Sequence, residues 1–196
     1  MKKPPRRRSV PATAFPTRER IFNAALRLLR VGGTETATMR AICDEAGITP
    51  PTLYHYFGDM KGLYREVVEQ MMRSDAAMAA GFGPKETIKE VWNSHIQLAT
   101  NEPGLFDAWN RHIAWDRLTS TSLHSYETLV QSFQVLGEDY PLKVPAKTAA
   151  YLFWAAAHGI ACLIAASQHD GVPYARGAAE NLKGSVLQGV FERHPF

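Results

Sequence analysis

The chain has 196 residues, which allows one compact domain or a small module joined to a medium one. Its 45% hydrophobic and 21% charged residues are typical of a soluble globular protein, so collagen-like, mucin-like and wholly disordered chains are excluded. The two cysteines, Cys43 and Cys162, are too few for a disulfide-stapled scaffold or a four-thiolate zinc site within one chain. They favour the reducing cytoplasm as the compartment.

Positive charge is concentrated at the N-terminus. Residues 1–60 contain ten Lys and Arg against five Asp and Glu, whereas residues 61–196 contain twelve against fourteen. The first sixteen residues are also rich in proline, and they are expected to form a disordered arm whose basic residues are Lys2, Lys3, Arg6, Arg7 and Arg8. Such an arm indicates a polyanionic partner, with nucleic acid ahead of a membrane surface. The alternative is a tail that only keeps the protein soluble.

From Thr17 onward the apolar residues recur with helical spacing and runs of alternating β-branched residues are missing, which predicts an all-α protein. The first helix starts at about Thr17 and ends at Gly32 and Gly33, because glycine is the usual residue beyond a helix C-terminus. A second helix, capped by the Thr38 side chain, ends at Gly47.

A short third helix follows, with Thr49 as its predicted side-chain cap and Pro50 at its first position, where the missing N–H costs nothing. It ends near Phe57. Six longer helices complete a predicted set of about nine, separated by segments rich in Gly, Pro and Asn, at about 60–80, 85–101, 104–115, 120–138, 146–168 and 175–193.

Residues 149–166 are almost wholly apolar and close to the length of a membrane span. Half of these positions are Ala or Gly, which favour close packing between helices, and His158 lies in the middle. We therefore interpret the segment as a buried helix and expect no membrane association. The N-terminus has basic residues but no apolar stretch of the length that a signal peptide needs, so secretion is not indicated.

Two short helices joined at Gly47, the second started by a proline, have the spacing of a helix-turn-helix. Residues 17–58 are interpreted as a three-helix DNA-binding domain and residues 59–196 as a separate helical domain. The segment TMRAICDEAGITPPTLYHYFGDMKGL, from Thr38 to Leu63, resembles the DNA-binding segment of TetR-type transcriptional regulators. The residues that match the family pattern are Gly33, Thr38, Arg40, Ile42, Ala46, Gly47, Ile48, Thr49, Thr52, Leu53, Tyr54, Tyr56 and Phe57.

This resemblance covers about residues 17–70. It implies a homodimeric DNA-binding regulator, a repressor, that binds a pseudopalindromic double-stranded operator and is released by a small apolar or aromatic effector. The second domain is then the ligand-binding and dimerisation domain. No cofactor, metal site or enzymatic activity is implied.

The residues expected to face DNA lie on the second and third helices, at the start of the fourth and in the basic arm. Thr52 and His55 are expected to reach bases, while the Tyr54 and Tyr56 hydroxyls reach phosphates. Arg40 contacts a phosphate or forms an ion pair with Asp44, four residues on. The full set is Thr38, Arg40, Thr49, Pro50, Pro51, Thr52, Tyr54, His55, Tyr56, Lys61, Arg6, Arg7 and Arg8.

Two positions depart from the family pattern. Met60 stands where the family usually has a phosphate-contacting Lys, and Lys61 is adjacent, although one residue turns a helical side chain by about 100°. Thr34 stands where an aromatic residue is usual. The basic arm could compensate by following the DNA backbone or entering the minor groove.

The stretch from Trp154 to Leu163, WAAAHGIACL, resembles the Trp-x-x-x-His-Gly stretch of one C-terminal subtype of the family. Ala155 and Gly159 would permit close approach of another helix. The last two helices of each chain are therefore expected to form a four-helix dimer interface. The final helix contributes a stripe of Ala178, Leu182, Val186 and Val190.

An effector pocket is suggested by aromatic and histidine residues, which could line an apolar cavity with a few polar points. The alternative for each aromatic residue is plain core packing. The pocket candidates are Trp92, His95, Phe106, Trp109, Tyr126, Phe133, Trp154 and His158.

Two other functions compete with this interpretation. An enzyme would have to use His158 and Cys162, but a thiol among Ala, Ile and Leu has a raised pKa and little thiolate. His-Glu-x-x-His, phosphate-binding Gly loops and Gly-x-Ser-x-Gly motifs are missing from the sequence. A DNA-binding protein that needs no ligand is the other alternative.

Overall fold

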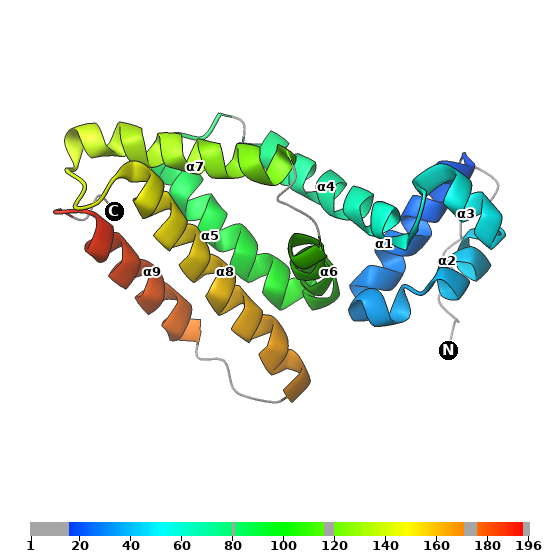
Figure 1. The fold of residues 1–196 in the computed structure, drawn as a ribbon. Helices are drawn as coiled ribbons and strands as arrows, with labels where there is room; N and C mark the ends of the chain where they lie inside the picture. The colour runs from blue at the N-terminus through cyan, green and yellow to red at the C-terminus, as the bar shows by residue number, and fades with distance from the viewer. Residues whose placement is uncertain (1–15, 80, 116–119, 171–175, 194–196) are drawn as a thin grey trace, which may run out of the picture.

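The structure is a computed structural model that describes residues 16–79, 81–115, 120–170 and 176–193. The predicted basic arm, with Arg6, Arg7 and Arg8, lies outside these residues. The described chain is all α-helical, as predicted, and Figure 1 shows the arrangement of its helices. They are α1 (Thr17–Thr36), α2 (Met39–Ala46), α3 (Pro50–Phe57), α4 (Met60–Ala79), α5 (Pro84–Asn101), α6 (Pro103–Trp115), α7 (Ser120–Asp139), α8 (Ala146–Asp170) and α9 (Arg176–Val190).

Helices α1 to α3 form a head around a core of fully buried side chains. Ile21 and Leu29 of α1, Ile42 of α2 and Leu53 of α3 meet there, together with Leu63 from the first turns of α4. The same core continues into the body through Leu105, Phe106 and Trp109 of α6. Helix α4 leaves the head and runs toward α7, so it connects the two parts of the molecule (Figure 1).

The end of α1 follows the glycines that the sequence singled out. The helical backbone is interrupted at Gly32 and Gly33, and Gly33 has φ 65°, the left-handed region that glycine adopts without strain. One further turn reaches Thr36, whose hydroxyl donates to the Leu28 carbonyl oxygen at 2.6 Å. The kink brings Gly33 against Gly104 at the start of α6, where the two backbones touch.

The body packs α5 between α7 and α8 and places α9 along α8 (Figure 1). Its second core contains Ile88 and Trp92 of α5, Phe133 of α7 and Phe153 of α8. The sequence predicted a last helix to about residue 193, but α9 ends at Val190. Beyond it the chain bonds to the segment before α8 instead, since the Glu192 N–H donates to the Pro141 carbonyl oxygen at 2.9 Å.

Within the described residues, Ala146–Ser167 is long and apolar enough to span a membrane by length and composition. One third of its most apolar window is buried, and the helix packs against α5, α7 and α9. The core helix of a soluble protein can have the same length and apolar composition, so these two properties are weak evidence that the helix spans a membrane.

Candidate nucleic-acid interface and ligand cavity

Helix α3 presents most of its surface to solvent. Leu53 is fully buried and Phe57 is half-buried against the head core, so these two residues fix the helix. Tyr54 and Tyr56 are 46% and 40% exposed. The side of α3 opposite Leu53 is thus free of contacts with the core. The other exposed residues at its N-terminus and along it are Thr49, Pro50, Pro51 and His55, with Thr52 half-buried.

The caps of α2 and α3 differ. As predicted, the Thr38 hydroxyl accepts a hydrogen bond from the Ala41 N–H at 3.3 Å. The predicted side-chain cap at Thr49 is wrong, although Thr49 has the extended backbone of a cap residue. Its hydroxyl lies 3.1 Å from that of Thr52, because one hydroxyl pairs with the other instead of with the backbone. Both hydroxyls stay at the exposed N-terminus of α3.

Arg40 and Asp44 form only a loose pair, with 3.9 Å between Nε and Oδ2. Their side chains are 93% and 76% exposed. An ion pair this exposed contributes no more than about a few tenths of a kcal/mol to the stability of the protein. The Arg40 guanidinium is therefore open to solvent. In α4, Met60 packs partly buried against the head core, while Lys61 is exposed.

Side chains of α1 tie the helix-turn-helix in place, and sequence reasoning missed them. Arg20 donates to the carbonyl oxygens of Ala46 and, at 3.1 Å, Gly47, at the end of α2. Arg27 pairs with Glu45 at 2.6 Å. The spacing of Arg20 and Arg27, seven residues, puts them on one face of α1, which is the signal that could have found them.

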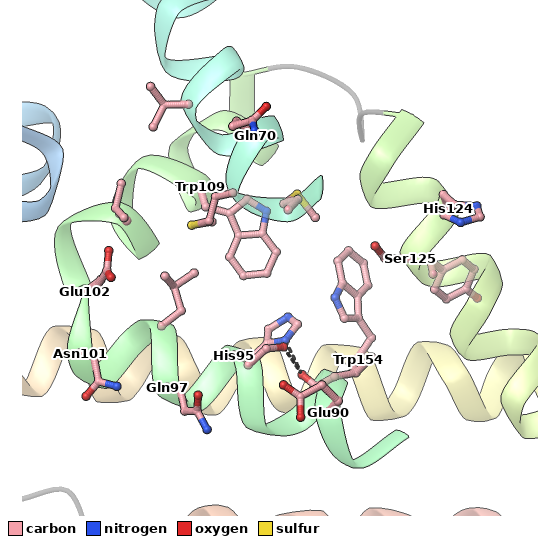
Figure 2. A pocket seen from close by; sticks show the side chains of 18 of the residues that line it. Gln70, Glu90, His95, Gln97, Asn101, Glu102, Trp109, His124, Ser125 and Trp154 are labelled. Atoms are coloured by element: carbon pink, nitrogen blue, oxygen red, sulfur yellow. Dashed lines mark hydrogen bonds between the residues drawn. The ribbon is translucent and has the colours of Figure 1, made fainter. Parts of the chain in front are cut away.

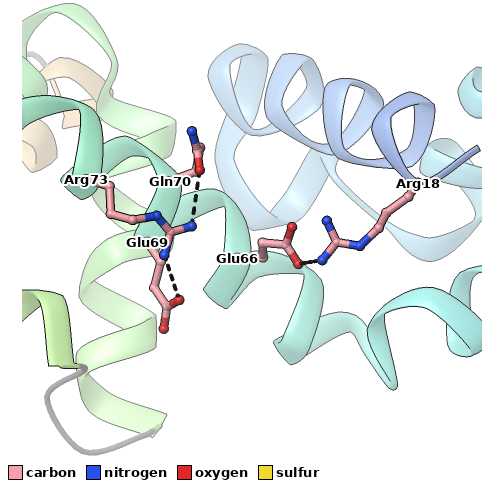
Figure 3. A network of polar contacts seen from close by, with 5 residues as sticks. All are labelled: Arg18, Glu66, Glu69, Gln70 and Arg73. Carbon is pink, nitrogen blue, oxygen red and sulfur yellow. Dashed lines mark hydrogen bonds and ion pairs between the residues drawn. The ribbon is translucent and has the colours of Figure 1, made fainter. Parts of the chain in front are cut away.

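Two further contacts fix α4 to the head. Arg18 pairs with Glu66 (Figure 3), and its guanidinium lies 5.0 Å from the centre of the Phe57 ring. The Tyr64 hydroxyl donates to the Ala37 carbonyl oxygen at 2.6 Å, and burial raises the pKa of Tyr64. These contacts connect α4 to α3, through Arg18, and to the turn before α2.

A cavity of about 810 Å³ lies where α1 and α4 meet the body. His95, Trp109, Tyr126 and Trp154, four of the predicted pocket residues, line it, and Figure 2 shows the His95 ring beside the Trp109 and Trp154 indoles. His158 does not line the cavity, but its ring centroid is 5.2 Å from that of Trp109. The other three candidates, which are fully buried in the two cores, do not line it, so plain packing accounts for Trp92, Phe106 and Phe133.

The cavity reaches further into the head than the sequence suggested. Phe22, Leu26 and Arg30 of α1 contribute to its wall, as does Met71 of α4. Periodicity marks these residues only as apolar or surface positions, because a cavity wall shared by distant segments leaves no local pattern. The Arg30 guanidinium pairs with Glu102 of the α5–α6 turn at 2.8 Å, and both line the cavity.

The outward face of α8 is apolar. Tyr151, Leu152 and Leu163 are 60%, 46% and 65% exposed, and Gly159 faces open space. This face is a candidate interface. On α9, Ala178 is exposed and Leu182 and Val186 are half-buried, but Val190 is buried in the core of its own chain and does not belong to the outward stripe.

The enzymatic alternative gains no catalytic group in the described structure. The Cys162 thiol is half-buried and contacts Asn110, whose Nδ2 lies 3.5 Å from the sulfur. The described residues contain no group of three or more His, Cys, Asp or Glu side chains that could hold a metal ion.

Residues 21–67 match the family described as "Bacterial regulatory proteins, tetR family". The transcriptional regulator UidR of Escherichia coli K12 is 42% identical over 57 residues, or 29% of each chain. The transcriptional repressor KstR of Mycobacterium tuberculosis is 26% identical over 121 residues, which cover 59% of this chain and 55% of KstR. These curated relatives are thus matched over about half of their length or less, and they are named as regulators.

Solved structures extend the likeness to the whole fold. The TetR-type regulator SCO7222 of Streptomyces coelicolor superposes with a TM-score of 0.63 at 20% identity, covering 85% of this chain and 87% of that one. A TetR variant from Acinetobacter baumannii, solved in complex with minocycline, gives 0.62 at 19% identity, with 85% and 92% covered. Residues 21–67 therefore match the N-terminal domain of the TetR family, and the described chain has the all-α fold of these TetR structures.

Proposed function

We propose that the protein is a homodimeric DNA-binding transcriptional regulator, a repressor that a small apolar or aromatic ligand releases from its operator. The observation that carries this proposal is the TetR-family helix-turn-helix, whose α3 is held by Leu53 and exposes the rest of its surface. Repression is favoured by the name of KstR. Such a regulator works where its DNA is, in the cytoplasm.

Helix α3 is the recognition helix in this proposal. It enters the major groove with its N-terminal residues toward the bases, so that Thr52 and His55 contact base edges. The hydroxyls of Tyr54 and Tyr56, on the flanks of the helix, contact phosphates. Backbone N–H groups at the N-termini of α2 and α3 add further phosphate contacts. Arg40 and Lys61, which are both exposed, contribute positive charge toward phosphates in this proposal.

The dimer forms through α8 and α9. Burial of the exposed apolar side chains of Tyr151, Leu152 and Leu163 against a second copy would be favourable. The small residues Ala155 and Gly159 allow the same helix of that copy to approach closely. A twofold axis through this face presents two α3 helices to one side of the DNA. The Trp-x-x-x-His-Gly stretch of α8 then contributes its outer surface to the interface and Trp154 to the cavity.

The ligand acts by differential binding. Because α1 and α4 form part of the cavity wall, a molecule in the cavity touches the head as well as the body. Binding that favours a shifted α4 changes the separation of the two recognition helices from the one helical turn, about 34–36 Å, that adjacent half-sites require. The complex of the A. baumannii TetR variant with minocycline shows that a protein of this fold accommodates a small molecule.

Selection of binding sites from a random duplex pool tests the proposal. The expected result is enrichment of a pseudopalindrome whose half-sites lie one helical turn apart, with the full-length protein bound as one dimer per site. A pool without enrichment, or a single unpaired half-site, would contradict a dimeric sequence-specific regulator. The same selection with Leu53→Asp protein, in which α3 is not held, is the control for enrichment by charge alone.

A further inference from the structure

The aromatic wall of the cavity and the His158 ring packed behind it contain buried polar atoms without a hydrogen-bond partner among the described residues. They are Nε2 of His95, Nε1 of Trp109 and Nδ1 of His158. The three rings touch, with centroid separations of 4.9 Å for His95 and Trp109 and 6.0 Å for His95 and His158. Leaving a buried donor or acceptor unpaired is unfavourable, so a ligand group that pairs with these atoms is favoured here.

The tautomer of His95 is fixed by its other nitrogen. Nδ1 lies 2.7 Å from the Val91 carbonyl oxygen, and because a carbonyl only accepts, Nδ1 carries the proton. Burial lowers the pKa of His95 to about 4, so the ring is neutral at neutral pH. Nε2 therefore presents a lone pair and can only accept a hydrogen bond.

Trp109 supplies the complementary group. Its Nε1–H can only donate, and its ring packs edge to face on that of His95. An acceptor and a donor thus lie on adjacent rings, which a hydroxyl satisfies together, since it donates through its proton and accepts through its oxygen. A carboxylate could pair only with Trp109, and an ammonium only with His95.

The charges around the cavity also favour a neutral ligand. Of the lining residues, Arg30 has its guanidinium 2.8 Å from the Glu102 carboxylate, and Glu90 adds a second carboxylate. An anion would find no lysine or unpaired arginine among the lining residues. The aromatic and aliphatic side chains of Trp154, Tyr126 and Leu98 suit a hydrophobic body.

We propose that the cavity binds a neutral hydrophobic molecule carrying a hydroxyl, a phenol or an alcohol, whose hydroxyl donates to His95 Nε2 and accepts from Trp109 Nε1. Because both atoms are buried, the hydroxyl reaches them after a small side-chain movement at the wall, as is common on binding. The inference rests on the proposed function in one respect, namely that this cavity is the effector site.

Titration calorimetry of the full-length protein with three matched probes tests the inference: 4-cyclohexylphenol, its methyl ether 4-cyclohexylanisole and 4-cyclohexylbenzoate. The phenol is expected to bind at least about tenfold more tightly than the ether, which has lost the donor, and more tightly than the benzoate. Equal affinity for phenol and ether, tightest binding of the benzoate, or no binding of the phenol would each overturn it.

Three variants locate the effect. Both His95→Phe and Trp109→Phe keep an aromatic ring and remove one polar atom. His95→Phe removes the acceptor to which only the phenol can donate, so it is expected to abolish most of the preference for phenol over ether. Trp109→Phe removes a donor from which the oxygen of either probe can accept, so it is expected to weaken the binding of both. Trp92→Phe is the matched control, because its Nε1–H is also buried and unpartnered but Trp92 packs on Phe153 away from the cavity. It should keep the full preference. An unchanged preference in His95→Phe, or an unchanged affinity for the phenol in Trp109→Phe, would contradict the assigned atoms.

DNA binding is measured on the same samples, so the two proposals fail separately. Phenol binding with the expected preference in a protein without specific DNA binding would leave the hydroxyl site standing and remove the regulator. Specific DNA binding with equal affinity for phenol and ether would do the reverse. Circular dichroism melts of each variant confirm that it is folded.

Discussion

At the scale of single residues, the head separates positions that hold α3 from positions that face outward. Leu53 is fully buried, whereas Tyr54 and His55 next to it are exposed. The outward residues make no contribution to the core, so their chemistry is free to serve a partner. A tyrosine hydroxyl can bind a phosphate, and this contact does not depend on the DNA sequence because the phosphate is the same at every base pair. An imidazole can bind a base edge, and this contact does depend on the sequence.

Tyr54→Phe and His55→Ala are therefore expected to differ in kind. Tyr54→Phe removes a phosphate contact and should weaken binding to all sequences alike, by about 1 kcal/mol. His55→Ala should cost about 1–3 kcal/mol on the best site and relax the preference at particular base pairs. Fluorescence anisotropy on an operator set with single base substitutions checks both. Identical profiles for the two variants across that set would refute the assignment.

His95 makes stability depend on pH. Burial lowers its pKa to about 4 in the folded protein from 6.5, with the charge of His158 acting in the same direction and the bond to Val91 opposing. Between pH 6.5 and pH 4 the unfolded chain protonates His95 while the folded protein keeps it neutral. The contribution of the neutral ring to stability is therefore fully present above about pH 6.5 and is lost as the pH falls toward 4. The loss is on the order of 3 kcal/mol for this shift.

Urea unfolding at pH 7 and pH 5 measures this loss. His95→Phe is expected to show a smaller drop than the wild type, because the variant has no imidazole to protonate at this position. Carboxylates titrate in both proteins, so the difference between them isolates His95. Burial also lowers the pKa of His158, which makes His158→Phe a second variant with an effect of the same sign. Equal drops in wild type and His95→Phe would contradict the burial of a neutral ring.

At the scale of elements, the helices of the described chain were predicted well from the sequence because each has a strong local signal. Gly47 and Pro50 mark ends that depend on backbone conformation alone, and these were predicted correctly. The predicted end at Gly32 and Gly33 is a kink instead, because α1 continues to Thr36. The errors lie where a distant or competing partner decides. Thr49 pairs with the Thr52 hydroxyl instead of the backbone, and the chain after Val190 bonds to Pro141 across the body.

The residues of the candidate site also fall into those that the sequence predicts and those that it does not. The exposed residues of α3 follow from the motif, and four lining residues follow from aromatic content. The contribution of Arg30 and Leu26 to the cavity could not be predicted from the sequence, because α1 is distant in sequence from α5 to α8. The kink at Gly33 brings α1 there by close contact with Gly104 of α6.

The contact between α1 and α6 gives a direct prediction. A Cβ at Gly104 would overlap the Leu29 carbonyl oxygen and lie 2.6 Å from the Gly33 nitrogen, both rigid backbone atoms. Gly104→Ala should therefore lower the free energy of unfolding by about 1–3 kcal/mol, the usual cost of overpacking. Gly177→Ala is the control and should not destabilise, because a Cβ there would have no neighbour within 4 Å among the described residues. Thermal denaturation compares them, and an unchanged melting temperature in Gly104→Ala would argue against the close contact.

The outward face of α8 gives a prediction about dimerisation. Leu163→Glu should weaken dimerisation by about 3 kcal/mol or more, since two unpaired carboxylates would be buried near a twofold axis. Val31→Glu changes an equally apolar residue, 79% exposed in the head, and should leave the dimer intact. Sedimentation velocity across a concentration series distinguishes the two. A dimer unaffected by Leu163→Glu would place the interface elsewhere.

At the scale of the whole molecule, the head and body share packing instead of being joined by a free linker. One core runs from Ile42 in α2 to Trp109 in α6, and α4 belongs to both parts. Thr34 adds a hydrogen bond to Asp107 at 3.3 Å, beside the Arg30–Glu102 pair at the cavity. A ligand in the cavity thus meets the surfaces on which the head rests. In the proposed mechanism, this shared packing is what a ligand would shift between a DNA-binding and a released arrangement.

The proposed regulator depends on sequence-specific DNA binding, which fluorescence anisotropy measures. Fluorescence anisotropy of the full-length protein is recorded on duplex DNA from the region flanking its own gene and on a scrambled duplex, across a salt series. Binding to the flanking duplex at 150 mM salt is expected to be tighter by at least about a thousandfold. Equal affinity for both duplexes, falling steeply with salt, would mean that only phosphates are bound and would contradict a sequence-specific regulator.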